Sequence, residues 1–409
     1  MLSQTFKIKT ALYINYFVFA ILLNSVGIVI LKAQENYGVD EVQASILELF
    51  KDLPIAIVSF LVASFLPRLG YKKAMLIGLG IVTFAALGMY AGNSFLSAKM
   101  LFLCVGAAFA LIKVSVYATI GLVTSNESEH NSLMSNIEGF FMFGITFAYF
   151  LFPAFNTEGT ANDWLNVYLL IALLCALSFA FLWTADFDET QEIAGVDLKD
   201  DFSQMLKLMS KLLVLVFVFS AFLFVMVEQG IMTWLPTFNK RVFDIPENVA
   251  IMMTAVLFIA MGVGRMLAGL LVKRINWFPL LVVCLLLAMA TVLFVLPEAI
   301  NSKIVGVTSL WEMPLLGFAF PIVGLFLAPI YPLINSTVLS ALPKKLHSQM
   351  TGLIIIFSAI GGTLGSRLIG YLFKNVGAES AFSYTLIPMG ILLIALFALY
   401  RLTRKPQAI

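Results

Sequence analysis

Charged residues are scarce in this chain, and their scarcity excludes most soluble proteins. Only 12% of its 409 residues are Asp, Glu, Lys or Arg, whereas 61% are hydrophobic. A water-soluble domain carries about 25% charged and about 45–50% apolar residues. The composition therefore excludes a soluble enzyme, a disordered chain and a collagen-like fibre. The formal net charge of +2 is too small to attract nucleic acid.

Cysteine and histidine are scarce as well. The three cysteines, Cys104, Cys175 and Cys284, are widely separated and lie in apolar stretches, so they predict neither a disulfide framework nor a metal site. The two histidines, His130 and His347, leave almost no material for a zinc site or a Ser-His-Asp enzyme. We therefore expect no metal, no cofactor and no enzymatic activity.

Long apolar stretches fill the chain instead. A helix that crosses a bilayer needs about 20 mostly apolar residues, because lipid offers the backbone no hydrogen-bond partners. The sequence predicts an all-α polytopic membrane protein with twelve such helices. The predicted spans are 10–34, 41–66, 74–93, 99–124, 132–154, 165–185, 209–236, 248–271, 277–297, 313–341, 349–373 and 381–400.

The distribution of lysine and arginine predicts the orientation. With both termini in the cytoplasm, fifteen of the 25 lysines and arginines lie in cytoplasmic segments and six in outer ones. The positive-inside rule favours this arrangement. We expect an integral protein of the cytoplasmic (inner) membrane of a bacterium, surrounded by lipid and monomeric.

One long hydrophilic segment, 186–207, separates six spans from six. Its acidic residues are typical of a solvated linker rather than of a binding tail. The sequence therefore predicts two six-helix bundles, 1–185 and 208–409, joined by a cytoplasmic linker.

The two halves also repeat a short motif. ASFLPRLGYKK (63–73) follows the second span, and GLLVKRIN (269–276) follows the eighth. The first segment resembles the tight loop between the second and third helices of the major facilitator superfamily, G-x-x-x-D-[RK]-x-G-[RK]-[RK], with Pro67 at the position of the acid. The resemblance implies transport by alternating access, with helices 1, 4, 7 and 10 around a central cavity.

Within that superfamily the chain is most similar to the fucose-permease branch of sugar–proton symporters. The similarity rests on short segments: 66–72 (LPRLGYK), 264–269 (GRMLAG), 331–332 (YP), 335–336 (NS) and 360–362 (IGG). The branch is expected to use carboxylates in the first and fourth helices for sugar binding and proton coupling. Those positions are Gly27 and Lys113 here.

Eight charged residues lie inside predicted spans, where each costs at least ~2.5–3.5 kcal/mol and needs a partner, water or a function. Three of them, Glu48, Lys51 and Asp52, share one face of the second span because they are spaced i, i+3 and i+4. One interpretation is an ion cluster that satisfies itself. The other is that Glu48 and Asp52 take up the coupling ion while Lys51 reaches the solute.

Lys113 lies near the midpoint of the fourth span. Its helix face carries Gly106, Ala110, Tyr117 and Gly121, and small residues beside a lysine and a tyrosine favour a cavity wall over a lipid-facing surface. We expect Lys113 and Tyr117 to bind the solute. The alternative is a buried lysine paired with Asp52 or Glu48.

Further candidates for solute binding come from three other helices. Glu228, Gln229 and Trp234 of the seventh span combine hydrogen-bonding groups with a ring that can stack on a polar solute, although a polar kink is the alternative. Neutral hydrogen-bonding partners are also available on helices 1 and 10, where a helix-packing role is equally open: Asn24, Tyr331 and Asn335.

Two pairs of opposite charge lie at matching depths and predict gates. In the superfamily, helix 5 faces helix 8 and helix 2 faces helix 11. Glu138 and Arg265 would close the inner side, and Glu48 and Arg367 the outer side. Arg68 of the motif is grouped with these gating residues. Alternatively, Arg265 stays within its own half.

These features predict a secondary active transporter of a small polar organic solute, bearing a carboxylate or zwitterionic, coupled to protons with sodium as the alternative ion. Two other functions remain open: a neutral sugar–proton symporter, as the branch implies, and a membrane receptor that kept the fold without transport. An ATP-driven pump is disfavoured because the chain lacks a G-x-x-x-x-G-K-[ST] loop.

Overall fold

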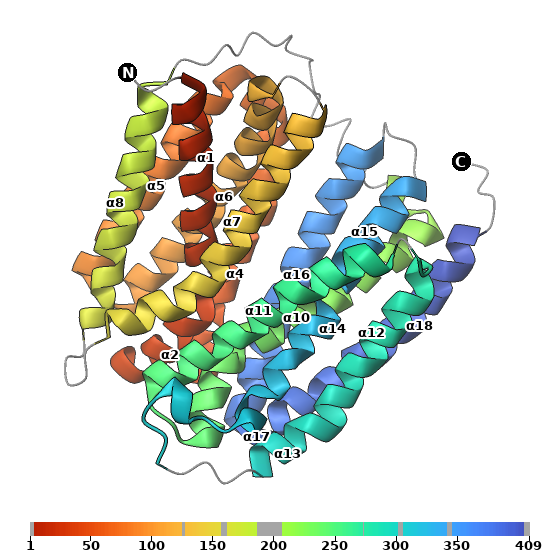
Figure 1. The fold of residues 1–409 in the computed structure, drawn as a ribbon. Coiled ribbons are helices and arrows are strands. Elements are labelled where there is room, and N and C mark those ends of the chain that lie inside the picture. The colour runs from red at the N-terminus through yellow and green to blue at the C-terminus, as the bar shows by residue number, and fades with distance from the viewer. Residues whose placement is uncertain are drawn as a thin grey trace. The chain divides into compact units, whose positions relative to one another are not determined.

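The chain folds into two compact units of helices (Figure 1). Unit 1 comprises Met1–Val39 and Ile46–Leu198, and unit 2 comprises Asp40–Ser45 and Lys199–Ile409. Of the predicted linker, 186–207, only Lys207 lies within the described residues. The computed structural model describes residues 4–124, 127–156, 162–185, 207–272, 274–301, 306–341 and 346–404.

Twelve helical spans account for most of the described chain. Eleven of them are long and apolar enough to cross a membrane. The twelfth, α4 (Ile46–Leu69), is 24 residues long and carries Glu48, Lys51 and Asp52 near its start. This is the twelve-helix architecture that the sequence predicts, because only helices satisfy their own backbone groups in lipid.

Unit 1 is built around α6, which packs on α4 and α5, and around α1, which packs on α7 and α8. A capping box between Ser94 and Ser97 begins α6. Gly70, with φ of 87°, makes the tight turn of the motif between α4 and α5. The other elements of unit 1 are α1 (Gln4–Asn24), α2 (Val26–Tyr37), α5 (Tyr71–Gly92), α6 (Phe95–Val123), α7 (Glu127–Ala154), η1 (Asp163–Leu165) and α8 (Asn166–Trp183).

The first predicted span is two helices rather than one. Ser25 interrupts the helix between α1 and α2, and its hydroxyl donates to the Leu22 carbonyl at 2.9 Å. The Asn24 side chain donates to the Ala20 carbonyl at 2.9 Å. Short polar side chains compete with the helix for backbone groups, which explains a break at this pair.

Unit 2 is organised around α10, which packs on α16, α18 and α11. Gly365 permits the closest of these contacts, because a Cβ there would collide with the Met226 carbonyl. The elements of unit 2 are α3 (Glu41–Ala44), α10 (Leu212–Phe243), α11 (Glu247–Leu271), α12 (Trp277–Ala290), the π-helical turn η2 (Thr291–Val295), α13 (Leu296–Asn301), η3 (Leu310–Glu312), η4 (Leu315–Phe318), η5 (Phe320–Ile322), α14 (Val323–Leu327), α15 (Ile330–Ala341), α16 (His347–Asn375), α17 (Ala378–Ala381), η7 (Phe382–Thr385) and α18 (Leu386–Arg404).

The tenth predicted span, 313–341, is broken. Three short 3₁₀ turns precede α14, and α14 ends before α15 begins at Ile330. Pro321 and Pro329 lie at these interruptions, and proline removes a helix hydrogen bond and crowds the preceding turn. The span therefore presents irregular backbone immediately before Tyr331 and Asn335.

Short α3 is tied to the rest of unit 2 by two ion pairs. Asp40 accepts a bond from Lys374 of α16 at 2.8 Å, and Glu41 accepts one from Arg241 of α10 at 2.5 Å. Asp40 also caps α3 in a capping box with Gln43. These pairs lie at the ends of their helices, where the side chains are partly exposed.

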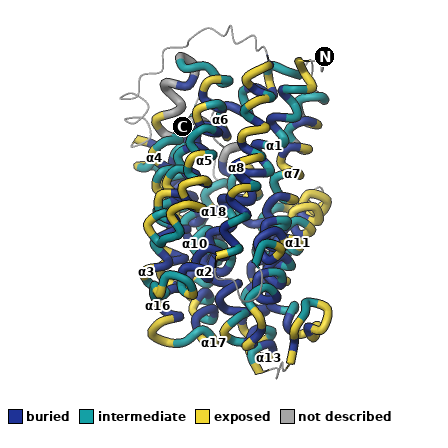
Figure 2. The backbone as a smooth tube through the Cα atoms, turned by 90° about the vertical axis from the view of Figure 1, so that its left-hand side faces the viewer, coloured by how far each residue is buried: buried dark blue, intermediate teal, exposed yellow. Residues whose placement is uncertain are grey.

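Large apolar side chains cover the outside of both units. Phe84, Phe294 and Ile394 are each more than two-thirds exposed, at 76%, 71% and 71%. Figure 2 shows exposed and buried stretches alternating along the same helices. Apolar exposure on this scale is expected of a surface that faces lipid.

Candidate functional site

Lys113 of α6 is a charged residue inside a span of unit 1. It is exposed although it lies inside the span Phe95–Val123. Its ammonium lies 5.8 Å from the centroid of the Phe109 ring and 6.0 Å from that of Tyr117. Within the described part of the chain, no carboxylate forms an ion pair with it. A lysine held only against aromatic faces keeps its charge available to an anion.

A carboxylate of α7 completes this arrangement. Tyr117 donates a hydrogen bond of 2.5 Å to Glu138 Oε1, and Glu138 interacts electrostatically with Lys113. Glu138 is also exposed within its span, Ser132–Ala154. The sequence predicts Glu138 as a gating residue, and the structure places it beside two predicted solute-binding residues. Because a charge inside a span is costly in lipid, we expect the face that carries Lys113 and Glu138 to meet water.

Tyr16 of α1 is the fourth member of the group and was missed by the sequence analysis. Its ring centroid lies 6.1 Å from that of Tyr117, and its side chain is only 2% exposed. Its buried hydroxyl interacts with the hydroxyl of Tyr117 and with Glu138. Its spacing from Asn24, two helical turns along one face, is the signal that would have found it. We call Tyr16, Lys113, Tyr117 and Glu138 the open group.

The second charged group of unit 1 has the opposite character. Lys51 bonds Glu48 one turn earlier in α4 and lies 3.5 Å from Asp52. The Glu48 side chain is fully buried, and those of Lys51 and Asp52 are 7% and 13% exposed. We call these three residues the closed cluster. In this geometry Lys51 contacts both carboxylates of its own helix, and uptake of the coupling ion by Glu48 and Asp52 stays a prediction.

Neighbouring helices enclose the closed cluster. A Cβ at Gly106 of α6 would collide with the Lys51 carbonyl, so α6 packs directly on this part of α4. Tyr149 of α7 interacts electrostatically with Glu48 and donates a 2.9 Å bond to the Asn24 carbonyl. Asn24 thus has a packing role at the end of α1, which leaves solute binding by its side chain a prediction.

Unit 2 carries a polar group of similar composition. Glu228 lies near the middle of α10 and interacts electrostatically with Arg265 of α11. Tyr331 of α15 interacts with Glu228 and lies 3.0 Å, hydroxyl to hydroxyl, from Ser358 of α16. Arg265 therefore has an electrostatic partner within unit 2, and both its role in the inner gate and the alternative stay predictions.

Asn335 extends the polar group of unit 2. It follows Tyr331 by four residues and therefore shares its face of α15. Its side chain bonds Tyr331, and its buried Oδ1 atom has no hydrogen-bond partner among the described residues. The broken helix just before α15 adds irregular backbone to this region, a feature that transporters use at solute and ion sites.

Two other residues of the seventh span were predicted to bind the solute, and their side chains bond to groups within unit 2. Trp234 is fully buried, and its indole nitrogen donates to the Ser366 carbonyl at 2.8 Å, so its ring packs within unit 2. Gln229 donates to the Thr233 hydroxyl at 3.2 Å, one turn along α10. The helix continues through Pro236 to Phe243, so Glu228 and Gln229 lie well inside α10.

The predicted gates join residues of different units and stay predictions. Arg367 is exposed on α16. The Arg68 side chain lies outside the described part of the structure. Glu48, the predicted outer partner of Arg367, is engaged by Lys51 within unit 1.

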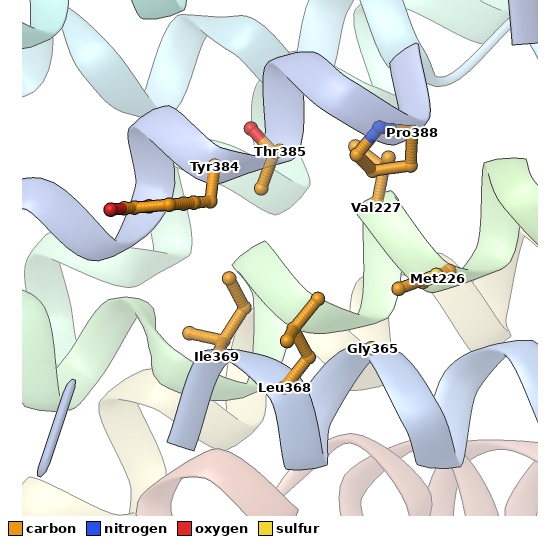
Figure 3. A pocket seen from close by; sticks show the side chains of 8 residues that line it. All are labelled: Met226, Val227, Gly365, Leu368, Ile369, Tyr384, Thr385 and Pro388. Carbon is orange, nitrogen blue, oxygen red and sulfur yellow. The ribbon is translucent and has the colours of Figure 1, made fainter. Parts of the chain in front are cut away.

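A small pocket in unit 2 has a different character from the polar groups. It lies where α10, α16 and the η7–α18 segment meet (Figure 3). Its walls include Met226, Leu368 and Ile369, and its few polar atoms do not converge. An apolar wall of this kind offers a polar solute no hydrogen bonds. Among the described residues, no group of three or more His, Cys, Asp and Glu could hold a metal ion.

Comparisons with known proteins agree on the fold. A sequence model of the Major Facilitator Superfamily matches residues 12–365, and no curated protein sequence matches the chain. The nucleoside transporter NupG superposes with a TM-score of 0.74 at 12% identity, over 99% of this chain and 100% of that one. The D-xylose-proton symporter gives 0.71 at 14% identity over 98% of both chains. The E. coli fucose:proton symporter FucP gives 0.63 at 16% identity, over 99% of this chain and 100% of that one.

Proposed function

Because the chain belongs to the Major Facilitator Superfamily, we propose that it is a secondary active transporter that moves a small polar organic solute across the membrane by alternating access. The observation that carries the proposal is the open group. Lys113 is exposed within a span and holds no ion pair among the described residues, and Glu138, with which it interacts electrostatically, accepts a hydrogen bond from Tyr117. A charge at this depth is costly without a function.

The open group favours a solute that carries a carboxylate. Lys113 offers a positive charge, whereas Glu138 is already hydrogen-bonded by Tyr117. A cation beside a carboxylate that is already bonded is matched by an organic acid, an amino acid or a small peptide, because the anionic group of the solute finds an opposite charge. Unit 2 by itself has a similar combination, with Arg265 as the cation and Glu228 as the carboxylate.

A neutral sugar transported with protons is the second candidate. It is supported by the ring surfaces around the polar groups: Phe109 stacks on Phe141 with centroids 6.2 Å apart, and Phe224 stacks on Tyr331 at 5.9 Å. Flat rings of this kind can bury the apolar faces of a sugar. Two solved structures of this fold, those of the xylose and fucose symporters, belong to proteins named for that activity.

We further propose protons as the coupling ion, a monomer as the working form, and the cytoplasmic membrane of a bacterium as the location, with both termini inside. The orientation rests on the excess of lysine and arginine in the segments on that side. Sodium is the alternative ion. A receptor that kept the fold without transport is the alternative activity.

A binding screen followed by counterflow tests the proposal. Purified protein is screened by thermal shift against organic acids, amino acids, dipeptides and neutral sugars, and each stabilising compound is then used in liposome counterflow. We expect a carboxylate to stabilise the protein and to exchange. Exchange of neutral sugars alone would favour the second candidate, and binding without exchange would favour the receptor.

A pair of variants on α6 connects the screen to the site. Lys113→Gln should lower affinity for the stabilising carboxylate about tenfold or more, roughly the loss of one charge-assisted hydrogen bond. Lys99→Gln, the same change at the start of the helix where Lys99 lies 5.0 Å from the Phe95 ring, should leave affinity unchanged. Equal affinity in both variants would remove Lys113 from the site.

A further inference from the structure

Aromatic rings from three helices lie beside the ammonium of the open group. The Lys113 Nζ atom lies 5.8 Å from the centroid of the Phe109 ring and 6.0 Å from that of Tyr117, both on α6. The Phe109 ring stacks on Phe141 of α7, with centroids 6.2 Å apart and ring planes at 29°. The Tyr16 ring of α1 meets Phe141 edge-on, with centroids 5.6 Å apart. The electron-rich faces of Phe109 and Tyr117 attract the ammonium and hold it beside this aromatic surface.

The charged groups and the stacked rings form two neighbouring layers. Phe109 lies one turn before Lys113 on α6, and Phe141 lies one turn after Glu138 on α7. Each ring therefore shares a helix face with the charge next to it. Between the Tyr117–Glu138 contact and the ring pair, residue numbers fall along α6 as they rise along α7, so both rings lie on the same side of the charges. α1 packs against both helices (Figure 1).

The stacked rings keep part of their surface open. Phe109 and Phe141 are both partly exposed. Because the charges on the same face are costly in lipid, we expect this face to border the path of the solute. A phenylalanine ring offers apolar contact and has no hydrogen-bonding group. An aliphatic acid such as succinate would meet the Lys113 ammonium and leave the ring surface facing water.

We propose that the solute is an aryl carboxylate, an anion whose carboxylate is joined to a flat aromatic ring directly or through one carbon. Lys113 binds the carboxylate, and the aromatic ring packs on the stacked pair of Phe109 and Phe141. Aromatic rings prefer offset-stacked or edge-to-face neighbours, and such pairs contribute beyond the area that they bury. The ring pair therefore selects a flat ring over a saturated ring of the same size. This assignment narrows the solute class of the proposed function and rests on it.

Binding of matched acids tests the assignment. Purified protein is titrated with benzoate and cyclohexanecarboxylate, and with phenylacetate and cyclohexylacetate, in thermal-shift series that give an apparent Kd for each acid. We expect at least one aryl acid to bind about fivefold or more tightly than its saturated partner, the contribution of roughly one aromatic pair. The amide of that aryl acid should bind at least about tenfold more weakly than the acid, because it has no anionic group for Lys113.

Variants of the ring pair separate stacking from charge. Phe141→Leu should weaken binding of the aryl acid and bring the two affinities of the matched pair to within about twofold of each other. Phe109→Leu should act in the same way. Phe141→Tyr keeps the ring and should keep the preference. Lys113→Gln should weaken both acids of the pair alike, because both carry the carboxylate.

The control for the ring pair is Phe143→Leu on the same helix. The Phe143 ring stacks on Phe17 of α1, with centroids 5.8 Å apart, and it is 58% exposed. Its loss should leave the preference for the aryl acid unchanged. The unfolding midpoint of each variant without ligand shows that the protein is folded before binding is compared.

The outcomes separate this inference from the proposed function. Equal affinity for the aryl and the saturated acid of both pairs would refute the aryl carboxylate and leave a carboxylate solute standing. Binding of none of the four acids would refute it as well, and the broader screen of carboxylates and sugars then decides the solute class separately. An amide that binds as tightly as its acid would overturn the role of Lys113. A preference that survives in both Phe109→Leu and Phe141→Leu would overturn the role of the ring pair.

Discussion

Unit 1 contains two groups built from the same kinds of residue, and they differ in how their charges are satisfied. In the closed cluster, one lysine serves two carboxylates of its own helix, and all three side chains are almost fully buried. In the open group, a lysine and a carboxylate on different helices stay exposed and form no ion pair with each other. Charge inside a span therefore does not by itself identify a site. Exposure and the lack of an ionic partner do.

Spacing along the chain explains the difference. Residues three and four apart on a helix meet whatever the tertiary structure, so Lys51 and its two acids can pair within α4. Lys113 has no carboxylate at such a spacing on α6. Its charge must be met by another helix, by water or by a solute. Unit 2 follows the second pattern, because Glu228 and Arg265 belong to different helices.

Removing the cation of the closed cluster should have the largest effect. Lys51→Met leaves Glu48 and Asp52 buried without their shared partner, and breaking a buried pair in this way costs about 3–5 kcal/mol. We expect a large loss of thermal stability in detergent, measured by unfolding of the purified variant. A triple variant with Glu48→Leu, Lys51→Met and Asp52→Leu should recover most of the loss, because it leaves no unpaired buried charge.

The control for this variant is Lys99→Met at the start of α6. Its ammonium lies 5.0 Å from the centroid of the Phe95 ring and pairs with no buried carboxylate among the described residues. The substitution should therefore lower the free energy of unfolding by less than about 1 kcal/mol. If Lys51→Met is as stable as Lys99→Met, the closed cluster does not contribute to the fold, and the comparison between the two groups fails.

Substitutions at the predicted gates should have the next largest effect. Arg265→Gln removes the inner pair with Glu138, and Arg367→Gln removes the outer pair with Glu48. Each should bias the protein toward the state in which that side is open, by about 1–3 kcal/mol. Because Lys51 already engages Glu48, the shift in Arg367→Gln should be the smaller one.

Labelling of reporter cysteines on the two sides of the membrane measures these shifts. Accessibility should rise on the inner side in Arg265→Gln and on the outer side in Arg367→Gln. Shifts in the same direction would exclude the two-gate mechanism. An unchanged distribution in Arg265→Gln would mean that Arg265 serves only Glu228 within unit 2.

The sequence was sufficient for the helices and for contacts within a helix, and insufficient for contacts between helices. Lipid requires long apolar helices, so the twelve spans followed from hydropathy. The i, i+4 spacing predicted that Lys113 and Tyr117 share a face. The bond from Tyr117 to Glu138 depends on how α6 and α7 are rotated, which no local pattern encodes. Trp234 lies buried against α16 for the same reason.

Two tyrosine substitutions separate packing from function with a smaller effect. Tyr149 donates a 2.9 Å bond to the Asn24 carbonyl, so Tyr149→Phe should cost roughly 1 kcal/mol in the free energy of unfolding. Tyr16→Phe removes a hydroxyl that interacts with Tyr117 of the open group, and it should weaken solute binding severalfold while costing less stability than Tyr149→Phe. Unfolding and binding measured on both variants decide this. Destabilisation by Tyr16→Phe as large as that by Tyr149→Phe, with binding unchanged, would assign Tyr16 to packing alone.

Substitution in the partly exposed ion pair of Asp40 and Lys374 should have the smallest effect on stability. The hydrogen bond from Lys374 holds the pKa of Asp40 below its ordinary value of 3.8. A lowered folded-state pKa stabilises the protein above the unfolded-state value, and this contribution disappears as the pH falls through the folded-state pKa. Because both side chains are partly exposed, at 46% for Lys374 and 35% for Asp40, water screens the pair.

Asp40→Asn should therefore lower the melting temperature at neutral pH by only about 1 °C, and the difference from the wild type should vanish in acid. In a Lys374→Met background the same substitution should have less effect at every pH, because the bond that lowers the pKa is gone. A difference that grows in acid, or that is unchanged in the Lys374→Met background, would contradict the assignment of the pair.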